Sequence, residues 1–129
     1  MIKEISDFVM KKMNGKREII PAPRLLNPRE LADVITMRDD DLGLQRCTNI
    51  SWVLGDWHPN AGFEWGYSGQ GPTDFAVNIL MHFTGGDAEF SMQHRIEFRE
   101  KFVATMPRGG GRIKKEDILK FISEKSLVA

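Results

Sequence analysis

The chain has 129 residues, of which 41% are hydrophobic and 28% charged, a composition that provides apolar material for a single domain over residues 1–129 and argues against two separate cores. Eighteen basic residues balance eighteen acidic ones, which makes nucleic acid an unexpected partner, because phosphate binding needs a clustered excess of Lys and Arg. The single cysteine excludes an internal disulfide. No apolar run reaches the roughly 18–20 residues of a membrane span, and the N-terminus is unlike a signal peptide. We therefore expect a cytoplasmic protein without a membrane partner.

The first half of the chain is predicted to form two helices and one strand. Apolar residues at helical spacing predict a helix over residues 2–13. Residues 16–26 hold two prolines and are expected to form an extended connector. Residues 27–38 predict a second helix, because Asn27 is a good N-cap and is followed by a proline at the first helical position and a glutamate at the third. A partly alternating pattern predicts a strand over residues 44–54.

The second half centres on one strand–turn–helix unit. Residues 62–67 predict a strand and residues 68–72 a glycine-rich turn. The turn leads into a helix whose core face has five apolar residues, Phe75, Ala76, Ile79, Leu80 and Phe83. Residues 87–106 predict a further helix, Ile113 a short strand and residues 115–124 a last helix. The fold is therefore predicted to be α+β, with about four helices packed on a small sheet of two to four short strands.

One run, at residues 63–72, reads FEWGYSGQGP and enters the predicted helix. It resembles an uncharacterised domain family of bacterial and phage proteins, whose hallmark is a W-G-Y-x-G-x-G-P run followed by two further helices. The likeness covers residues 62–119, and residues 1–60 lie outside it. Because that family has no established activity, the resemblance implies no catalytic residue.

The glycine turn at residues 66–71 is the first candidate binding site. Free backbone N–H groups at the start of the following helix make an anion site in principle, although no Gly-Lys-Ser/Thr follows as in a P-loop. The alternative is structural: Gly69 and Gly71 permit a positive φ in a tight reversal, with Trp65 and Tyr67 packed around it. We favour the structural interpretation, and we expect Trp65 to be buried with Tyr67 on the same face.

Arg95 and Arg99 are the second candidate. Their spacing of four residues places both on the apolar face of the helix predicted over residues 87–106. A buried arginine needs an acceptor. An internal carboxylate is the favoured acceptor, with Glu64 the first choice and Asp74 another. An external anion or the acidic surface of a partner is the alternative.

These observations favour binding over catalysis. The three histidines form no metal-ligand pattern with Cys47, so we expect neither a metal nor a cofactor. We interpret the chain as a small non-catalytic binding or regulatory protein of a bacterium or phage that acts through a protein–protein surface; inhibition of a host defence factor is one such role, and self-association stays open. The alternative is a nucleotide- or anion-binding enzyme or sensor that combines the turn with the arginine pair. The candidate binding residues are Glu64, Trp65, Tyr67, Gly69, Gly71, Arg95 and Arg99.

Overall fold

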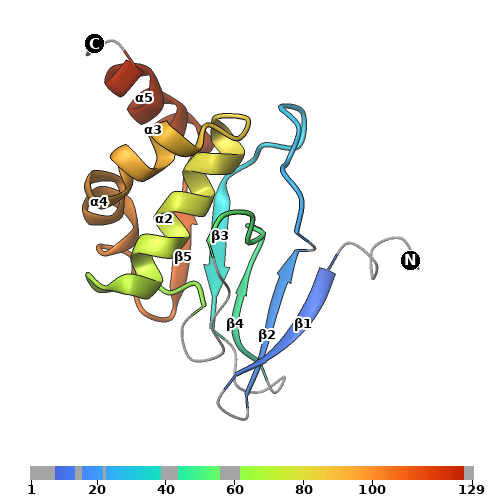
Figure 1. Cartoon of the computed structure of the whole chain (residues 1–129). Helices are drawn as coiled ribbons and strands as arrows, with labels where there is room; N and C mark the ends of the chain where they lie inside the picture. The colour runs from blue at the N-terminus through green and yellow to red at the C-terminus, as the bar shows by residue number, and fades with distance from the viewer. Residues whose placement is uncertain (1–7, 14–15, 22, 39–43, 56–61, 127–129) are drawn as a thin grey trace.

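A five-stranded sheet with its helices gathered on one face organises the protein (Figure 1). The computed structural model describes the backbone of residues 8–13, 16–21, 23–38, 44–55 and 62–126, and the side chains from residue 23 onward in these ranges except residues 44 and 45. The predicted α+β class is confirmed. None of the helices in these ranges combines the length and the hydropathy that a membrane span requires.

The sheet has the strand order β1-β2-β4-β3-β5. β1 and β2 form an antiparallel hairpin, β2 runs parallel to β4, and β3 lies antiparallel between β4 and β5. The antiparallel unit of β4, β3 and β5 falls within the predicted two to four strands, and β2 and β1 extend it to five. The strands span Phe8–Met13 (β1), Lys16–Pro21 (β2), Val34–Met37 (β3), Leu44–Thr48 (β4) and Gly110–Ile113 (β5).

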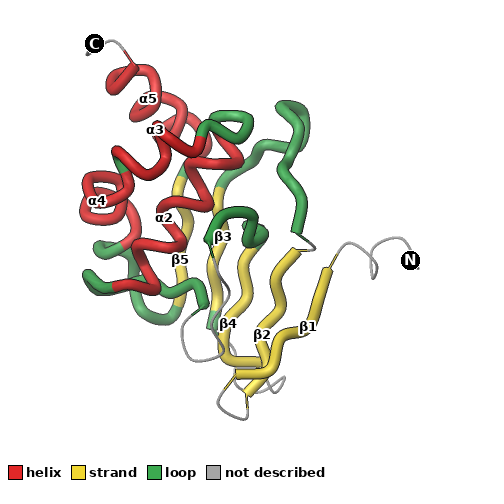
Figure 2. Tube along the Cα trace, viewed as in Figure 1, coloured by secondary structure: helices red, strands yellow, loops and turns green. Residues whose placement is uncertain are grey.

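The helices follow one another on the β5 side of the sheet (Figure 2). The helix predicted over residues 87–106 is present in three pieces, because it is interrupted at His94 and then widens into a π-helical turn. The first piece is capped by an aspartate, since the Asp87 carboxylate accepts from the backbone N–H of Phe90 at 3.0 Å. The helical elements span Gln70–Phe83 (α2), Ala88–Gln93 (α3), Arg95–Phe98 (α4), Arg99–Val103 (η1, the π turn) and Lys115–Ser126 (α5).

Aromatic rings fill the core between the sheet and the helices. Phe63 stacks between Trp52 and Phe75, with ring centroids 4.8 and 4.9 Å away. Phe98 meets Phe121 of α5 edge to face at 5.2 Å, so the helices also pack on one another. All five residues of the predicted α2 core face are buried. Such rings bury large apolar areas and dominate core energetics.

The helix predicted over residues 2–13 is wrong where the structure describes it. Residues 8–13 form β1, which pairs with β2 along its whole length, from Phe8 opposite Pro21 to Met13 opposite Lys16. Residues 2–7 lie outside the described residues. The Asn-Gly dipeptide that follows Met13 in the sequence is a strong short-range hairpin signal and agrees with the pairing of β1 with β2.

The helix predicted over residues 27–38 is also absent, although its capping interactions exist. The Asn27 Oδ1 atom accepts from the backbone N–H of Glu30 at 3.1 Å, and the Glu30 Oε1 atom accepts from the backbone N–H of Asn27 at 3.0 Å. These two hydrogen bonds close a single turn, and no helix continues from it. The β-branched run at residues 34–36 then favours a strand, and pairing of β3 with both β4 and β5 outweighs the helix start.

A buried amide joins α2 to the segment after β4. Asn78 is fully buried, and its Oδ1 atom accepts from the backbone N–H groups of Val53 at 2.6 Å and Leu54 at 2.9 Å. Its Nδ2 atom donates to the carbonyl oxygens of Leu54, at 3.2 Å, and of the α2 residue one turn earlier, at 2.8 Å. The strand predicted over residues 44–54 therefore ends at Thr48, since this segment bonds to a helix side chain instead of a neighbouring strand.

Candidate functional site

The segment that carries the glycine motif is irregular, so the strand predicted over residues 62–67 is wrong. Gly66 has a φ of +88°, which interrupts an extended run. Its backbone N–H donates to the carbonyl of Val103 at 3.0 Å, in η1 and not in a strand. A Cβ atom at this position would lie 2.5 Å from the Arg108 Cδ atom, which adds a steric reason for glycine.

Gly69 is the N-cap of α2 and Gly71 lies in its first turn, so the predicted turn is shorter than residues 68–72. Both glycines allow close packing, and the positive φ predicted for them is absent. Gly69 is extended, with a φ of −176°, and a Cβ atom there would lie 2.6 Å from the Tyr67 ring. A Cβ atom on Gly71 would lie 2.9 Å from the Glu64 Cβ atom. Both glycines therefore bring the start of α2 into contact with the motif that precedes it.

Glu64 pairs with arginines of the sheet, and the predicted pairing with Arg95 or Arg99 is wrong. Its carboxylate accepts from Arg38 at 2.6 and 3.3 Å and lies 3.5 Å from the Arg46 guanidinium. The Glu64 side chain is 14% exposed and that of Arg46 is 3% exposed. The carboxylate thus joins the residue after β3 and the middle of β4 to the segment that leads into α2, which is a structural role.

Trp65 and Tyr67 lie in different environments. Trp65 is fully buried, as predicted, and its Nε1 atom donates to the Arg108 carbonyl at 3.0 Å. Tyr67 is 41% exposed, with the Arg108 guanidinium 5.1 Å from its ring centre. The prediction that both rings share one face is wrong, because the positive φ of Gly66 between them turns the chain.

The two arginines of the second candidate site differ in their contacts. Arg99 is 16% exposed at its side chain, donates to the Thr73 hydroxyl at 2.9 Å and forms a salt bridge with Glu100. Arg95 donates to the carbonyl oxygen of Met92. Among the described residues, no carboxylate forms a salt bridge with Arg95. The Arg99 hydrogen bond, followed by that from Ser68, holds the pKa of the Glu100 carboxyl below its usual range.

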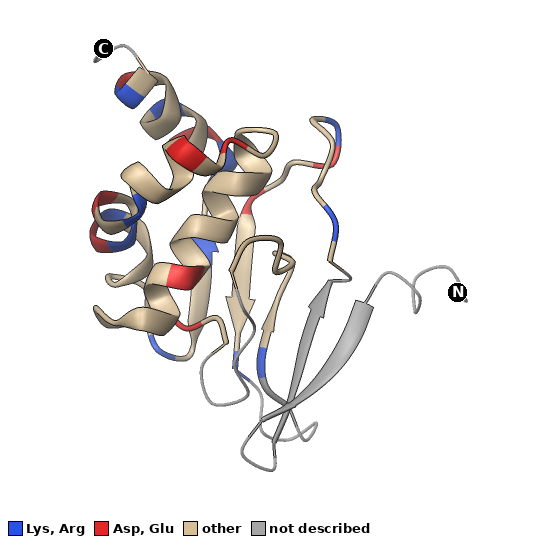
Figure 3. Ribbon diagram, in the orientation of Figure 1, with Lys and Arg blue, Asp and Glu red and all other residues tan. Residues whose placement is uncertain are grey.

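A groove of about 480 Å³ lies between α2 and the helices α3 and α4. Gly69 lines it together with both arginines, so the structure brings three of the seven candidate residues into one site. Met92 and Ile96, on the α3–α4 wall, are each 44% exposed. Figure 3 shows basic and acidic segments close together along α4 and η1. The groove therefore combines cationic and apolar side chains.

A π turn forms the end of the groove. The backbone N–H of Ala104 donates to the carbonyl of Arg99 at 2.7 Å, five residues earlier, instead of four. Phe98 and Val103, also five residues apart, are both fully buried in the core. Isolated π turns inside helices occur frequently at functional sites. Here Arg99, at the start of the turn, donates to Thr73 of α2, while Val103 at its end and Met106 beyond it remain buried in the core.

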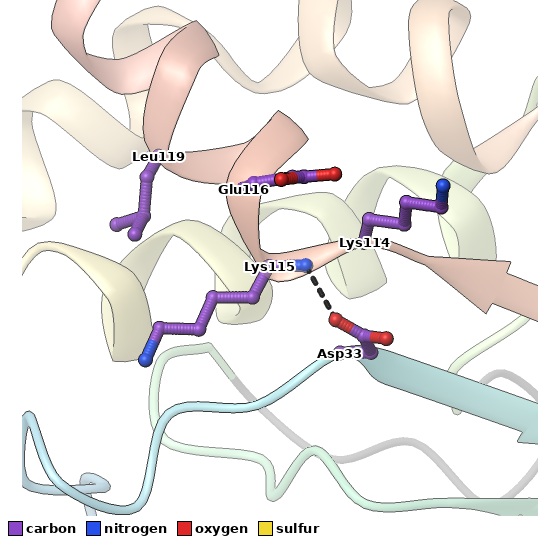
Figure 4. A pocket seen from close by; sticks show the side chains of 5 residues that line it. All are labelled: Asp33, Lys114, Lys115, Glu116 and Leu119. Atoms are coloured by element: carbon purple, nitrogen blue, oxygen red, sulfur yellow. Dashed lines mark hydrogen bonds between the residues drawn. The ribbon is translucent and has the colours of Figure 1, made fainter.

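A second pocket, of about 370 Å³, lies at the start of α5 (Figure 4). The Asp33 carboxylate accepts from the backbone N–H of Lys115 at 2.8 Å and from the Arg112 guanidinium at 3.1 Å. The bond from Lys115, followed by that from Arg112, lowers the pKa of Asp33. Asp33 therefore caps α5 from 82 positions away in the sequence, and these contacts explain the pocket as part of the fold.

A buried Ser–His pair was not predicted from the sequence. The His82 Nδ1 atom accepts from the backbone N–H of Leu26 at 3.1 Å, so the proton of the neutral ring is on Nε2, which donates to the Ser51 carbonyl at 2.9 Å. The Ser51 hydroxyl donates to the Arg24 carbonyl at 2.9 Å. His82 and Ser51 are 1% and 2% exposed. These hydrogen bonds attach the segment before β3 and the segment after β4 to α2.

The described residues contain no group of three or more His, Cys, Asp and Glu side chains that could hold a metal ion. Cys47 lies half-buried on β4, and burial raises the pKa of its thiol. A raised pKa disfavours the thiolate that a nucleophile or a metal ligand requires.

Residues 33–124 match a family of unknown function, DUF6166. This stretch runs from β3 into α5 and contains the groove, and it extends beyond the resemblance noted over residues 62–119. The expectation of a domain family without a known activity is therefore confirmed. Neither the curated proteins nor the solved structures contain a match to the chain.

Proposed function

We propose that this chain, which belongs to the family of unknown function DUF6166, is a binding protein that holds a segment of another protein in the groove between α2 and α4. The observation that carries the proposal is the exposure of Met92 and Ile96, each 44%, beside Arg95. Methionine and arginine are enriched in protein–protein interfaces, and arginine is common among the residues that dominate binding energy.

The form of the groove also supports binding of a protein segment. Its volume of about 480 Å³ is sufficient for a few side chains. The opposite wall includes Leu54, which is held by Asn78 through two hydrogen bonds, at 2.9 and 3.2 Å. A wall fixed in this way loses little conformational entropy on binding, which favours affinity.

Site-specific photo-crosslinking in the cells that encode the chain tests the proposal. A photoreactive phenylalanine analogue replaces Met92 in the groove or, as the control, Lys120 on the exposed side of α5. We expect a discrete covalent adduct with another protein from position 92 and none from position 120. The same adducts at both positions, or none at position 92, would contradict the proposal. The identity of the partner then decides whether the chain acts in a bacterium or a phage, and whether it inhibits a defence factor.

A second candidate function is supported by one observation: Gly69, Arg95 and Arg99 line the same groove. An anion such as a nucleotide phosphate would then bind there. A panel of nucleotides and inorganic pyrophosphate, tested by thermal melting, separates the two functions. A nucleotide-dependent rise in melting temperature that Arg99→Ala abolishes would favour the nucleotide sensor over the protein-binding groove.

A further inference from the structure

The two cations that line the groove come from α4, which carries Arg95, and from η1, which begins at Arg99. Arg95 uses one N–H to reach the carbonyl of Met92, whereas a guanidinium has five N–H donors in a planar fork. Within the described part of the chain, Arg95 forms no salt bridge. Arg99, in contrast, is already engaged by Thr73 and Glu100. Among the described residues, Arg95 has no hydrogen-bond acceptor other than the Met92 carbonyl, which leaves donors for an occupant of the groove.

Apolar side chains flank this cation on the same wall. Met92 and Ile96 lie on either side of the interruption at His94, in α3 and α4, both line the groove, and the chain positions Arg95 directly before Ile96. Val77 lines the α2 wall that faces them. An occupant would thus meet an apolar surface and a cation within one turn of helix.

The described lining of the groove contains two cations, Arg95 and Arg99, and one carboxylate, Asp74. Arg99 is already paired with Glu100, so among the described residues the positive charge offered to an occupant is that of Arg95. Asp74 lies on α2 and accepts from the Gln70 side chain at 2.7 Å. Complementary charge favours specific association and disfavours partners of like charge, so the occupant should be acidic at the point where it faces α4.

We infer that the protein segment held in the groove carries an acidic side chain next to an apolar one, and that Arg95 binds the acidic group while Met92 and Ile96 bind the apolar group. This inference rests on the proposed function. Carboxylate is the chemistry that a guanidinium recognises through two parallel hydrogen bonds. A basic or purely apolar segment would leave Arg95 without this contact.

A display library of random peptides of about a dozen residues, selected on the immobilised full chain, tests the inference. We expect the wild-type protein to enrich peptides in which Asp or Glu neighbours Leu, Ile, Met or Phe. A selected peptide should bind Arg95→Glu about tenfold or more weakly, which corresponds to about 1.4 kcal/mol. A parallel selection on Arg95→Glu should enrich Lys or Arg in place of the acidic residue.

Lys120→Glu is the matched control, because it makes the same kind of charge change on an exposed α5 position and should leave binding unchanged. Melting of each variant shows that the fold is retained. Three results would overturn the inference: no enriched peptide, enrichment without an acidic preference, or equal binding by Arg95→Glu. An analogue of a selected peptide that carries Gln in place of Glu and binds with equal affinity would also overturn the inference.

These outcomes are separate from the fate of the proposed function. A partner that crosslinks at position 92 but whose bound segment lacks an acidic residue would retain the binding function and refute the role of Arg95. Absence of crosslinks at position 92 together with binding of inorganic pyrophosphate would refute both in favour of an anion site.

Discussion

Replacement of Asn78 by alanine removes four hydrogen bonds at once and should weaken both the fold and the groove. The amide group joins α2 to Val53 and Leu54 through backbone donors and acceptors, at distances of 2.6–3.2 Å. Two backbone N–H groups would lose their acceptor. Leu54, which lines the groove, would lose its attachment to α2.

The expected loss follows from the two orphaned donors. An unsatisfied buried polar group costs about 1–3 kcal/mol, and both N–H groups lie in a partly buried segment, so we expect a total loss of about 2–4 kcal/mol. In a domain of this size that loss lowers the melting temperature by roughly 7–15 °C. Asn78→Asp retains the acceptor and places a second oxygen against two carbonyl oxygens, so it should also be destabilising at neutral pH.

The pH dependence separates the two variants. Burial beside carbonyl oxygens would raise the pKa of the new carboxyl above its unfolded value of about 3.9. A group of this kind is most favourable below its unfolded pKa and loses stability as pH rises through the folded pKa. The deficit of Asn78→Asp relative to the wild type should therefore shrink at acid pH, whereas the deficit of Asn78→Ala should remain constant.

Urea and thermal unfolding, followed by circular dichroism, measure these differences, and amide hydrogen exchange locates them. We expect the amide protons of Val53 and Leu54 to lose protection in Asn78→Ala while those of the strand β3 retain it. A melting temperature of Asn78→Ala within about 2 °C of the wild type, or unchanged protection at both amides, would refute the assignment of Asn78 as the attachment point.

Three further predictions concern the motif and the buried histidine. A double-mutant cycle should give about 1–3 kcal/mol of coupling between Arg38 and Glu64 and none between Arg99 and Glu64; coupling to Arg99 alone would contradict the network of Glu64 with the sheet. Gly71→Val should destabilise by roughly 1–3 kcal/mol because its side chain meets the Glu64 Cβ atom, and denaturant unfolding equal to that of the wild type would rule this clash out. Burial lowers the pKa of His82. Below a pH of about 6.5 the unfolded chain therefore binds a proton at this histidine that the folded chain does not bind. The free energy of unfolding should then fall from pH 7 to pH 5, by at most about 1.4 kcal/mol per pH unit. His82→Gln should show a shallower decline over this range, and an identical slope would exclude His82 as the cause.

The elements with a local signal were predicted well from the sequence. Pro and Gly residues lie at the start of α2, and Gly residues follow its end. The apolar residues of its core face keep helical spacing along the whole helix, so tertiary packing and local propensity agree. The Asp87 cap and the last helix have similar local signals. Residues 27–38 show the limit of this approach, because the cap of Asn27 is present and the strand partners on β4 and β5 decide the outcome.

The part of the candidate site that was predicted correctly also depends on local signals. Arg95 and Arg99 are close in sequence, and helical spacing was enough to place them together. Glu64 was assigned to the wrong arginines because its partners, Arg38 and Arg46, come from strands whose positions only the sheet topology fixes. The hydrogen bond of Leu26 to His82 joins residues 56 positions apart, and no pattern within a short window reports a contact of that range.

The π turn makes the fold dependent on the number of residues in this part of the chain. A π turn is equivalent to an α-helix with one residue inserted, and one residue rotates an α-helix by about 100°. Deletion of a single residue from Arg99–Val103 would close an ordinary α-helix and bring the segments on either side into a different rotational phase. If Val103 and Met106 kept their buried positions, the Arg95 face would turn away from α2; if the arginines stayed in the groove, the apolar residues after them would leave the core. The length of this segment, as distinct from the identity of its side chains, therefore couples the orientation of the groove wall to the packing of the residues that follow.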